Sequence, residues 1–169
     1  TPGIQLLVAR KGTVIYNKSF GKHSDNESVK VENNHLYDVA SMTKILATLP
    51  LIMELEEQGA LQLESTLGSL MPKLKNTNKD TLTVKEVLSH YGRLKAWIPF
   101  YMSTIDSITK KPSEEYYRQK GSKKFPIEVA KNLYLISNYK DSIFDRIANA
   151  DQRLNPGYKY SDLPYFLFK

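Results

Sequence analysis

The feature that most constrains the fold is a helical run of apolar residues that begins at Met42. Its members recur every three or four positions: Met42, Ile45, Leu46, Leu49, Ile52 and Met53. This spacing puts them on one face of an α-helix, so we predict a helix with one buried stripe. Pro50 lies inside the pattern and is expected to kink the helix, because proline has no backbone N–H. Gly59 is expected to end the helix.

Two β-rich runs, residues 4–10 and 13–20, precede this helix. Lys11-Gly12 separates them, and the glycine supplies the positive φ that a two-residue hairpin turn needs. We therefore predict a β-hairpin. The polar residues 22–35 are expected to form a loop that leads away from the sheet.

Further helices are predicted in the second half of the chain. Thr83 and Glu86 have the spacing of a capping box, which predicts a short helix ending near His90. Another helix is expected over much of residues 127–149, with a stripe formed by Ile143, Phe144, Ile147 and Ala148. A chain of 169 residues suffices for one domain with a core.

Composition excludes several kinds of chemistry. The chain has no cysteine, which removes disulfides, thiolate zinc sites and cysteine nucleophiles. Its three histidines lack a metal-ligand spacing, so we expect no metal and no cofactor. No apolar run reaches the ~18–20 residues of a membrane span, and the opening residues read as a strand rather than a signal peptide.

The net charge is +6, and lysines are densest at residues 110–124, "KKPSEEYYRQKGSKK". Tyr116 and Tyr117 beside Arg118 have the composition of a base-stacking surface. Acids are interleaved with these cations, however. We interpret the stretch as a solvated loop or helix face and expect no nucleic-acid partner.

Ser41 and Lys44, within "ASMTKI", form a Ser-x-x-Lys pair. The pattern occurs four times in the chain, so spacing alone is weak evidence, but only Ser41 heads a strongly amphipathic helix. Side chains three apart on a helix are neighbours, and a neutral lysine there accepts a serine proton. The alternative is that Ser41 only caps the helix and Lys44 is a solvated residue.

The flanking residues 36–72 resemble the serine β-lactamase and penicillin-binding protein superfamily. The branch of class C β-lactamases, DD-peptidases and related esterases is the most similar. The motifs that carry the resemblance are Ala40 before the Ser-x-x-Lys, then Gly59 with spaced leucines, and a Met-Pro at 71–72. Residues 82–94, "LTVKEVLSHYGRL", resemble a further family segment, in which Arg93 stands where glycine is usual.

A second catalytic motif of this branch is Tyr-x-Asn after a Pro-Gly turn. "NPGYKYSDLPYF" matches it with Tyr160 and Asp162, so an aspartate replaces the asparagine. A rival alignment reads Ser161-Asp162-Leu163 against the Ser-Asp-Asn motif of class A enzymes and puts Leu163 in the amide position.

The resemblance implies a serine hydrolase that works through an acyl-enzyme on an ester, a D-amino-acid peptide or a β-lactam. Ser41 would be the nucleophile, Lys44 its base, Tyr160 a second acid–base group, and Asp162 would occupy a substrate-binding position. A negative charge at Asp162 is expected to hold Lys44 protonated. The alternative is a non-catalytic binding or accessory module that keeps the fold.

The resemblance further implies an α+β fold. The chain would be a partial β-lactamase/transpeptidase-like domain over residues 1–169, with a sheet hairpin at 1–21 and a helical region at 36–169. The family's third motif, Lys-Thr-Gly or His-x-Gly, and the strands that follow it are absent, so we expect no turnover by this fragment. We also expect a peptidoglycan-type or small-molecule substrate and a periplasmic or extracellular location. Pairing with the missing half or with another chain would cover the hairpin's unpaired edges.

A narrower resemblance concerns "SHYGRLKAWIPFY" together with "KYSDLPYF". These segments are similar to β-lactamase-like domains fused to glycoside hydrolase family 3 enzymes, which implies a cell-wall or amino-sugar context by analogy.

Overall fold

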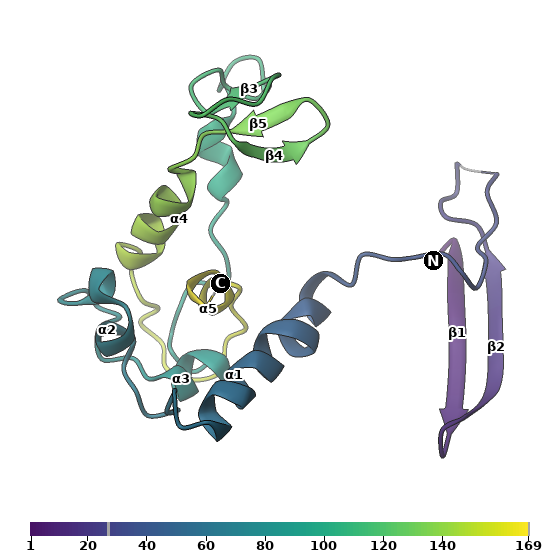
Figure 1. Cartoon of the computed structure of the whole chain (residues 1–169), viewed down its shortest axis with the longest axis horizontal. Helices are drawn as coiled ribbons and strands as arrows, with labels where there is room; N and C mark the ends of the chain where they lie inside the picture. Colours follow the sequence, from purple (N-terminus) through teal and green to yellow (C-terminus); the bar gives the residue numbers. More distant parts are fainter. Residues whose placement is uncertain (27, 169) are drawn as a thin grey trace. The chain divides into compact units, whose positions relative to one another are not determined.

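The computed structural model describes residues 1–26 and 28–168 of the chain (Figure 1). The chain divides into two compact units, Thr1–Met42 and Thr43–Lys169. Among these described residues, the first unit holds a β-hairpin and its return loop, and the second holds five α-helices and a small sheet. Within the described ranges, every helix is too short or too polar to span a membrane.

The predicted hairpin is confirmed. Strand β1 (Gly3–Arg10) pairs with β2 (Thr13–Gly21) in antiparallel register. Lys11 and Gly12 have φ values of +49° and +77°, the signature of a type I′ turn, whose twist matches that of the strands. Apolar side chains on both faces of the hairpin are exposed: Ile4, Leu6, Leu7, Val8, Val14, Ile15, Tyr16 and Phe20.

The loop after β2 returns to the hairpin, so the expectation that it leads away is wrong. Val31 is buried and its N–H donates to the Gly21 carbonyl at 3.0 Å. A Cβ on Gly3 would lie only 2.5 Å from the Val31 side chain, so glycine allows this close approach. The Gln5 amide also donates to the carbonyl of His35 at 2.9 Å. Burial of Val31 therefore closes the loop against the sheet.

The predicted long helix begins as a π-helical turn, Lys44–Thr48, and continues as helix α1 (Leu49–Glu57). The Leu49 N–H donates to the Lys44 carbonyl, five residues back. Pro50 has no N–H for the usual bond, and its ring would clash with the carbonyl four residues earlier, so the preceding turn widens. Gly59, with a φ of +71°, follows the end of the helix as predicted.

The prediction that the apolar stripe is buried is wrong. Of its six members only Ile52 is buried, at 5% exposure. More than half of the surface of Met42, Ile45, Leu46 and Met53 is exposed. The spacing predicts which residues share a face of the helix, but their burial depends on what other parts of the chain pack against that face.

The core of the second unit forms where the short helices α2 (Leu67–Leu70) and α3 (Val84–Leu88) meet the last two helices. The capping box that starts α3 is confirmed, because the Thr83 hydroxyl accepts the Glu86 N–H and the Glu86 carboxylate accepts the Thr83 N–H. The buried core residues are Leu67, Leu74, Val87, Leu94, Phe100, Ile147, Ala148, Leu163 and Leu167.

The chain turns sharply after α3 through residues with left-handed backbone. His90 and Arg93 have φ values of +65° and +55°. Arg93 therefore adopts the conformation that a glycine supplies without strain, at the position where the resembling family has glycine. Gly92, one place earlier, is buried, and a Cβ there would lie 2.9 Å from the Val87 side chain. The arginine is also anchored, because its carbonyl accepts the Arg153 N–H at 2.8 Å.

A three-stranded antiparallel sheet, in the order β3-β5-β4, replaces part of a predicted helix. Its strands are β3 (Tyr117–Arg118), β4 (Ile127–Ala130) and β5 (Leu133–Leu135). Helix α4 (Tyr139–Ala148) begins only after β5, so the helix predicted over much of residues 127–149 is wrong in its first half. Its apolar stripe is confirmed, since Ile147 and Ala148 are buried in the core. Ile127 and Val129 are β-branched, and a turn at residues 131–132 divides the segment 127–135 into two short runs, which favours strands over a helix.

The last helix, α5 (Leu163–Leu167), is held in place by the residues just before it. Ser161 is buried, and its hydroxyl donates to the Lys95 carbonyl at 2.7 Å. Its N–H donates to His90 Nδ1 at 3.2 Å. The Asp162 N–H donates to the Ala96 carbonyl at 2.8 Å. These bonds fix residues 160–162 against the turn that follows α3.

Lys79 is a buried cation, at 1% exposure, beneath the C-terminal end of α4. Its ammonium donates to Asn78 Oδ1 at 2.6 Å and to the carbonyls of Ala148 and Ala150. Burial lowers the pKa of this lysine. A cation at a helix C-terminus satisfies carbonyls that have no partner within the helix.

We expect Lys79→Met to destabilise the protein, because it leaves these carbonyls without a donor in a buried place. The free energy of unfolding should fall by about 1–3 kcal/mol, the cost of unsatisfied buried acceptors. Urea denaturation followed by circular dichroism measures the change. Lys85→Met, at an exposed position of α3, is the matched control and should have little effect. Equal effects of the two substitutions would contradict the capping role.

We expect the free energy of unfolding to fall on acidification, because His90 becomes protonated. Burial, and then the positive charge of Lys44, lowers the pKa of His90 below its ordinary value of 6.5. The unfolded chain then binds this proton more readily than the folded protein does. The contribution of His90 to the free energy of unfolding is therefore complete above about pH 6.5, and it is lost as the pH falls towards the pKa of His90 in the folded protein. Protonation also removes the Nδ1 lone pair that accepts the Ser161 N–H.

His90→Asn tests this expectation, because asparagine tolerates a positive φ and retains an acceptor but does not titrate. Melting temperatures of both proteins are measured between pH 5 and pH 7.5. The wild-type protein should lose more stability on acidification than the variant. His23 and His35 are present in both, so identical pH profiles would exclude His90 as the titrating group.

Candidate active site

Ser41 lies in a single 3-10 turn, Ala40–Met42, directly before the π-helical turn. Ala40 has a φ of +44°, an uncommon conformation for a residue with a Cβ. Its N–H donates to Asp38 Oδ1 at 2.7 Å, which stabilises this turn. The hydroxyl-bearing residue is exposed. The sequence therefore presents Ser41 on a locally strained turn at the start of the helix, a feature that recurs at functional sites.

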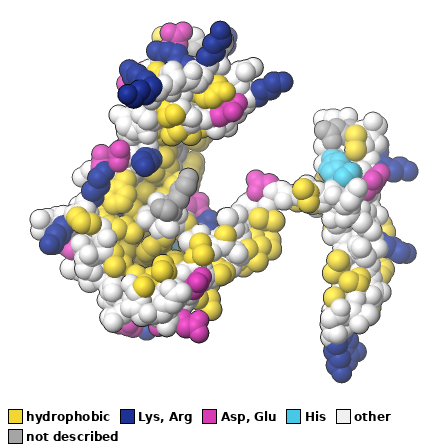
Figure 2. All heavy atoms as spheres, viewed as in Figure 1, with side chains coloured by type: hydrophobic (Ala, Val, Ile, Leu, Met, Phe, Trp, Pro, Cys, Tyr) yellow, Lys and Arg dark blue, Asp and Glu magenta, His cyan; other side chains and the backbone are white. Residues whose placement is uncertain are grey.

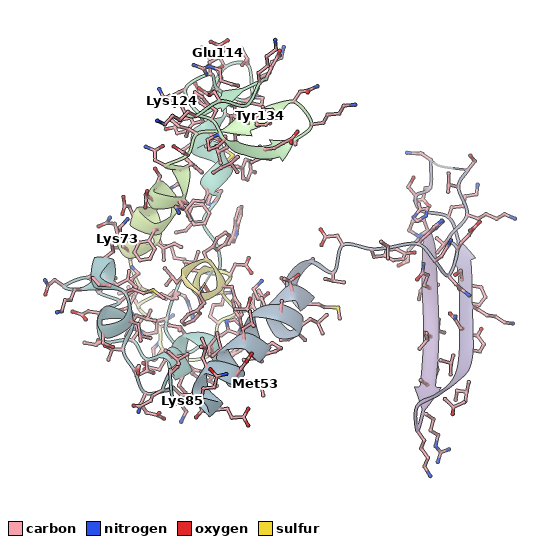
Figure 3. All side chains as sticks on the ribbon, in the orientation of Figure 1. Met53, Lys73, Lys85, Glu114, Lys124 and Tyr134 are labelled. Atoms are coloured by element: carbon pink, nitrogen blue, oxygen red, sulfur yellow. The ribbon has the colours of Figure 1, made fainter. Side chains whose placement is uncertain are left out.

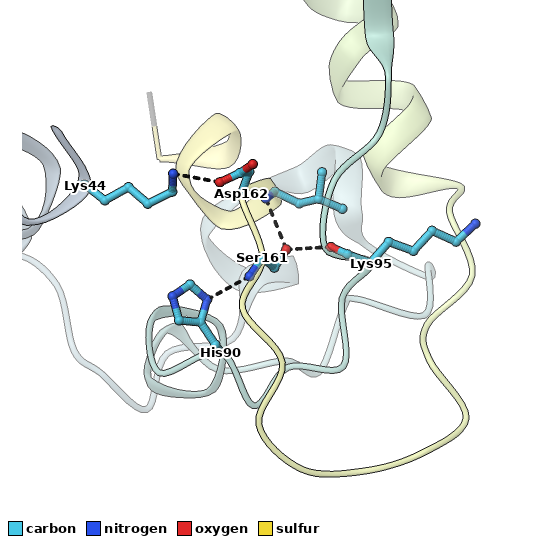
Figure 4. A network of polar contacts seen from close by, with 6 residues as sticks. Lys44, His90, Lys95, Ser161 and Asp162 are labelled. Carbon is cyan, nitrogen blue, oxygen red and sulfur yellow. Dashed lines mark hydrogen bonds and ion pairs between the residues drawn. The ribbon is translucent and has the colours of Figure 1, made fainter. Parts of the chain in front are cut away.

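Lys44 reaches from the π-helical turn to the start of α5 (Figure 4). Its Nζ lies 2.7 Å from Asp162 Oδ1, and the two side chains are 14% and 37% exposed. Two residues that are distant in the sequence are thus joined within the second unit by an ion pair that is partly shielded from water. Such shielding makes the attraction stronger than that of a surface pair.

Two phenol rings flank the same ammonium. Lys44 Nζ lies 5.3 Å from the ring centroid of Tyr160 and 5.4 Å from that of Tyr165. Both distances are in the cation–π range. The imidazole of His90 packs against the Tyr160 ring with centroids 4.7 Å apart, which helps to fix the position of that phenol.

Opposing effects set the pKa of Lys44. Burial alone lowers it, but the contacts with Asp162 and Tyr160 outweigh burial and raise the pKa above its ordinary value of 10.5. The lysine is therefore held as an ammonium at neutral pH. Burial raises the pKa of Tyr165 as well, and the nearby Lys44 charge only partly offsets this.

The residues of the two alignments of the second motif lie in different surroundings. Leu163 is fully buried in the core, and the hydroxyl of Ser161 is bonded to the Lys95 carbonyl, so neither presents a polar group to Lys44. Tyr160 and Asp162 do contact the lysine. The catalytic and substrate-binding roles of these residues stay predictions.

Of the four residues predicted for the site, Lys44, Tyr160 and Asp162 meet in the second unit. Ser41 precedes Lys44 by three positions in the chain. Sequence reasoning missed Tyr165. Its N–H donates to the Asp162 carbonyl at 3.1 Å in the first turn of α5. Pro164, a residue favoured at helix starts, was a signal that a turn begins here and brings Tyr165 back towards Asp162.

Comparison with known proteins gives consistent relatives. Protein flp of Staphylococcus aureus (strain NCTC 8325 / PS 47) is 30% identical over 113 residues, covering 65% of this chain and 22% of that protein. A putative D-alanyl-D-alanine carboxypeptidase of Escherichia coli (strain K12) is 26% identical over 181 residues, covering 98% of this chain and 36% of that protein.

Two solved structures share the fold. A putative β-lactamase from Bacteroides dorei DSM 17855 superposes with a TM-score of 0.62 at 17% identity, over 99% of this chain and 39% of that one. A class C β-lactamase from Rhodobacter sphaeroides gives 0.63 at 20% identity, over 99% and 37%. The chain thus spans well under half the length of these relatives.

These superpositions confirm the predicted α+β, β-lactamase-like fold. The narrower resemblance to domains fused to glycoside hydrolases stays a prediction. The Beta-lactamase family model matches residues 1–167, nearly the whole sequence. The chain therefore belongs to the β-lactamase family, within the serine β-lactamase and penicillin-binding protein superfamily.

Proposed function

We propose that this chain carries the nucleophile and acid–base residues of a serine hydrolase that works through an acyl-enzyme. The observation that carries the proposal is the convergence of Lys44, Tyr160 and Asp162 on one partly buried position. An ion pair with aspartate is common for a structural lysine, whereas two phenol rings at the same ammonium add a group that can donate and accept a proton.

In the proposed mechanism Ser41 Oγ attacks the carbonyl carbon of the substrate, and neutral Lys44 accepts the hydroxyl proton. The tetrahedral intermediate collapses as the Tyr160 phenol gives its proton to the leaving group, and the Lys44 ammonium returns a proton to the phenolate. Water then attacks the acyl carbon, its proton passes to Ser41 Oγ, and the carboxylic acid and the free serine are released. The Ser41 N–H, at the start of the helix, is proposed as one donor to the developing oxyanion.

Asp162 opposes the first step, because its carboxylate favours the ammonium form of Lys44. The charged lysine cannot accept a proton. This observation supports a second candidate function, a binding or accessory module that keeps the fold without turnover. The two candidates differ in whether Ser41 becomes acylated.

The proposed substrates are an ester, a D-amino-acid peptide or a β-lactam, since the similar proteins include a putative D-alanyl-D-alanine carboxypeptidase and a class C β-lactamase. Asparagine donates a hydrogen bond from its amide, whereas an ionised aspartate only accepts. We propose that Asp162 shifts recognition away from substrates that present a carbonyl at this position. Peptidoglycan-type substrates and a periplasmic or extracellular location also remain proposals.

Acylation of Ser41 tests the proposal directly. A protein that contains this sequence in its full reading frame is incubated with a fluorescent fluorophosphonate and, separately, with a fluorescent penicillin. We expect one labelled serine, and we expect Ser41→Ala to abolish the label. Ser137→Ala alters another Ser-x-x-Lys pair of the chain and should leave labelling unchanged.

Label that persists in Ser41→Ala would show that another residue reacts. Absence of label from the wild-type protein with both probes would instead favour the accessory module. Peptide mapping of the labelled protein separates these results, because the acylated residue is identified by mass.

Asp162→Asn is expected to speed up labelling at neutral pH. Removal of the carboxylate lowers the pKa of Lys44, so a larger fraction of the lysine is the neutral base. Asp162 accepts no capping bond through its side chain at the start of α5, so the helix start should survive the substitution. Labelling rates are measured by stopped reaction and gel fluorescence across pH 6–10.

Asp141→Asn is the matched control. Asp141 forms an exposed ion pair with Lys73 at 2.9 Å, away from Lys44. It should leave the labelling rate unchanged. A rate that is equal in wild type and Asp162→Asn over the whole pH range would contradict the view that Asp162 sets the charge of Lys44.

A further inference from the structure

The positive charge of the protein is concentrated in the lobe formed by residues 107–134, which contains the β3-β5-β4 sheet. This lobe has seven Lys or Arg residues and three Glu, a net charge of +4 out of the total of +6. Figure 2 shows dark blue side chains gathered over it, and Figure 3 labels Lys124, Glu114 and Tyr134 there. The seven cations are Lys110, Lys111, Arg118, Lys120, Lys123, Lys124 and Lys131.

Among the residues that the structure describes, no acidic side chain forms an ion pair with these cations. In the described parts of the chain, the ion pairs are those of Lys44 with Asp162 and Lys73 with Asp141, and neither involves the lobe. A cation that is not neutralised within its own protein keeps its full attraction for an external anion. The lobe therefore combines a high density of charge with an absence of internal neutralisation among the described residues.

The lobe surface is hollowed where the cations gather. One hollow is lined in part by Lys111, Glu114 and Arg118, and a second by Arg118, Lys120 and Lys124. Gln119 lines both, and it also lines a third hollow with Lys120 and Asn132. The three hollows adjoin at Gln119, and each has at least one cation in its wall; we refer to them together as the track. Glu114 is the one acidic side chain that lines it.

Arg118 is held rigidly at the centre of this track. Its guanidinium donates to the carbonyls of Glu114 and Tyr117 and stacks over the Phe125 ring, 4.6 Å from the centroid. Lys124 Nζ lies 5.7 Å from the same ring, which is itself buried. A preorganised arginine loses little side-chain entropy on binding an anion.

The aromatic side chains of the lobe are engaged in internal packing. Tyr116 packs edge-on against Tyr139, and the Tyr117 hydroxyl bonds to Thr104 Oγ1 at 2.9 Å. The Tyr134 ring covers Gly121, where a Cβ would lie 3.1 Å away. Recognition of single-stranded nucleic acid depends on bases that stack on available rings. The track therefore fits an anionic polymer without bases better than a nucleic acid.

We propose that the lobe of residues 107–134 is a binding site for an extended polyanion that carries phosphate groups and no bases. Successive anionic groups contact Lys111, Arg118, Lys120 and Lys124 along the track. The site is independent of the Ser41 and Lys44 chemistry, so it would serve to hold the protein on a charged polymer whether or not the chain is catalytic.

Binding of medium-length inorganic polyphosphate, measured by isothermal titration calorimetry between 50 and 300 mM salt, tests the proposal. The test variant is Lys111→Gln, Lys120→Gln and Lys124→Gln combined, which keeps Arg118 and its structural bonds. The control combines Lys18→Gln, Lys22→Gln and Lys30→Gln, an equal loss of charge from the first unit. Circular dichroism verifies that both variants are folded.

We expect the lobe variant to bind at least about tenfold more weakly at low salt, with the slope of log K against log salt reduced by about two, the loss of three phosphate contacts. The control variant should keep most of the affinity and the slope. Equal losses in both variants would show that only net charge matters and would overturn the proposal. So would absence of binding by the wild-type chain, or much tighter binding of a single-stranded oligonucleotide of equal charge.

Discussion

The ion pair between Lys44 and Asp162 is the interaction on which the arrangement of the candidate site depends. It joins the first helical turn of the second unit to the last helix, and it brings Tyr160 and Tyr165 against the ammonium. Opposing effects act on this lysine. Burial favours the neutral amine that a base requires, whereas Asp162 and Tyr160 favour the ammonium, and the second effect is larger. Lys44, Tyr160 and Asp162 therefore meet, but Lys44 is held mainly as the ammonium.

The position of Asp162 in turn depends on bonds made by its neighbour. Ser161 uses its hydroxyl and its N–H to bind Lys95 and His90, which fixes the segment that presents the carboxylate. His90 thus has a defined structural task, because its Nδ1 accepts the Ser161 N–H. The left-handed conformation of Arg93, where glycine is usual, follows from the sharp turn that places His90. A residue that departs from the family pattern need not change the backbone it occupies.

Local rules predicted the elements whose signals lie within a few residues. The Lys11-Gly12 turn, the capping box of α3 and the apolar stripe of α4 were all predicted from such signals. Predictions that required long-range contacts were less successful. The return of residues 22–35 depends on Val31 packing at Gly3, and β5 pairs with β3 across the loop between them. Exposure of Met42, Ile45 and Leu46 reflects what packs against the helix, which its own periodicity does not specify.

For the site, the family resemblance implied Lys44, Tyr160 and Asp162, but the sequence alone could not show that their side chains meet. The charge state of Lys44 can be measured directly. Nuclear magnetic resonance of protein with 13C-labelled lysine, with the Lys44 signal assigned by Lys44→Arg, gives its titration curve. If the contacts with Asp162 and Tyr160 outweigh burial, the pKa of Lys44 lies above the ordinary value of 10.5. A pKa clearly below that value would show that burial prevails over these contacts and that Lys44 is not held as the ammonium by Asp162.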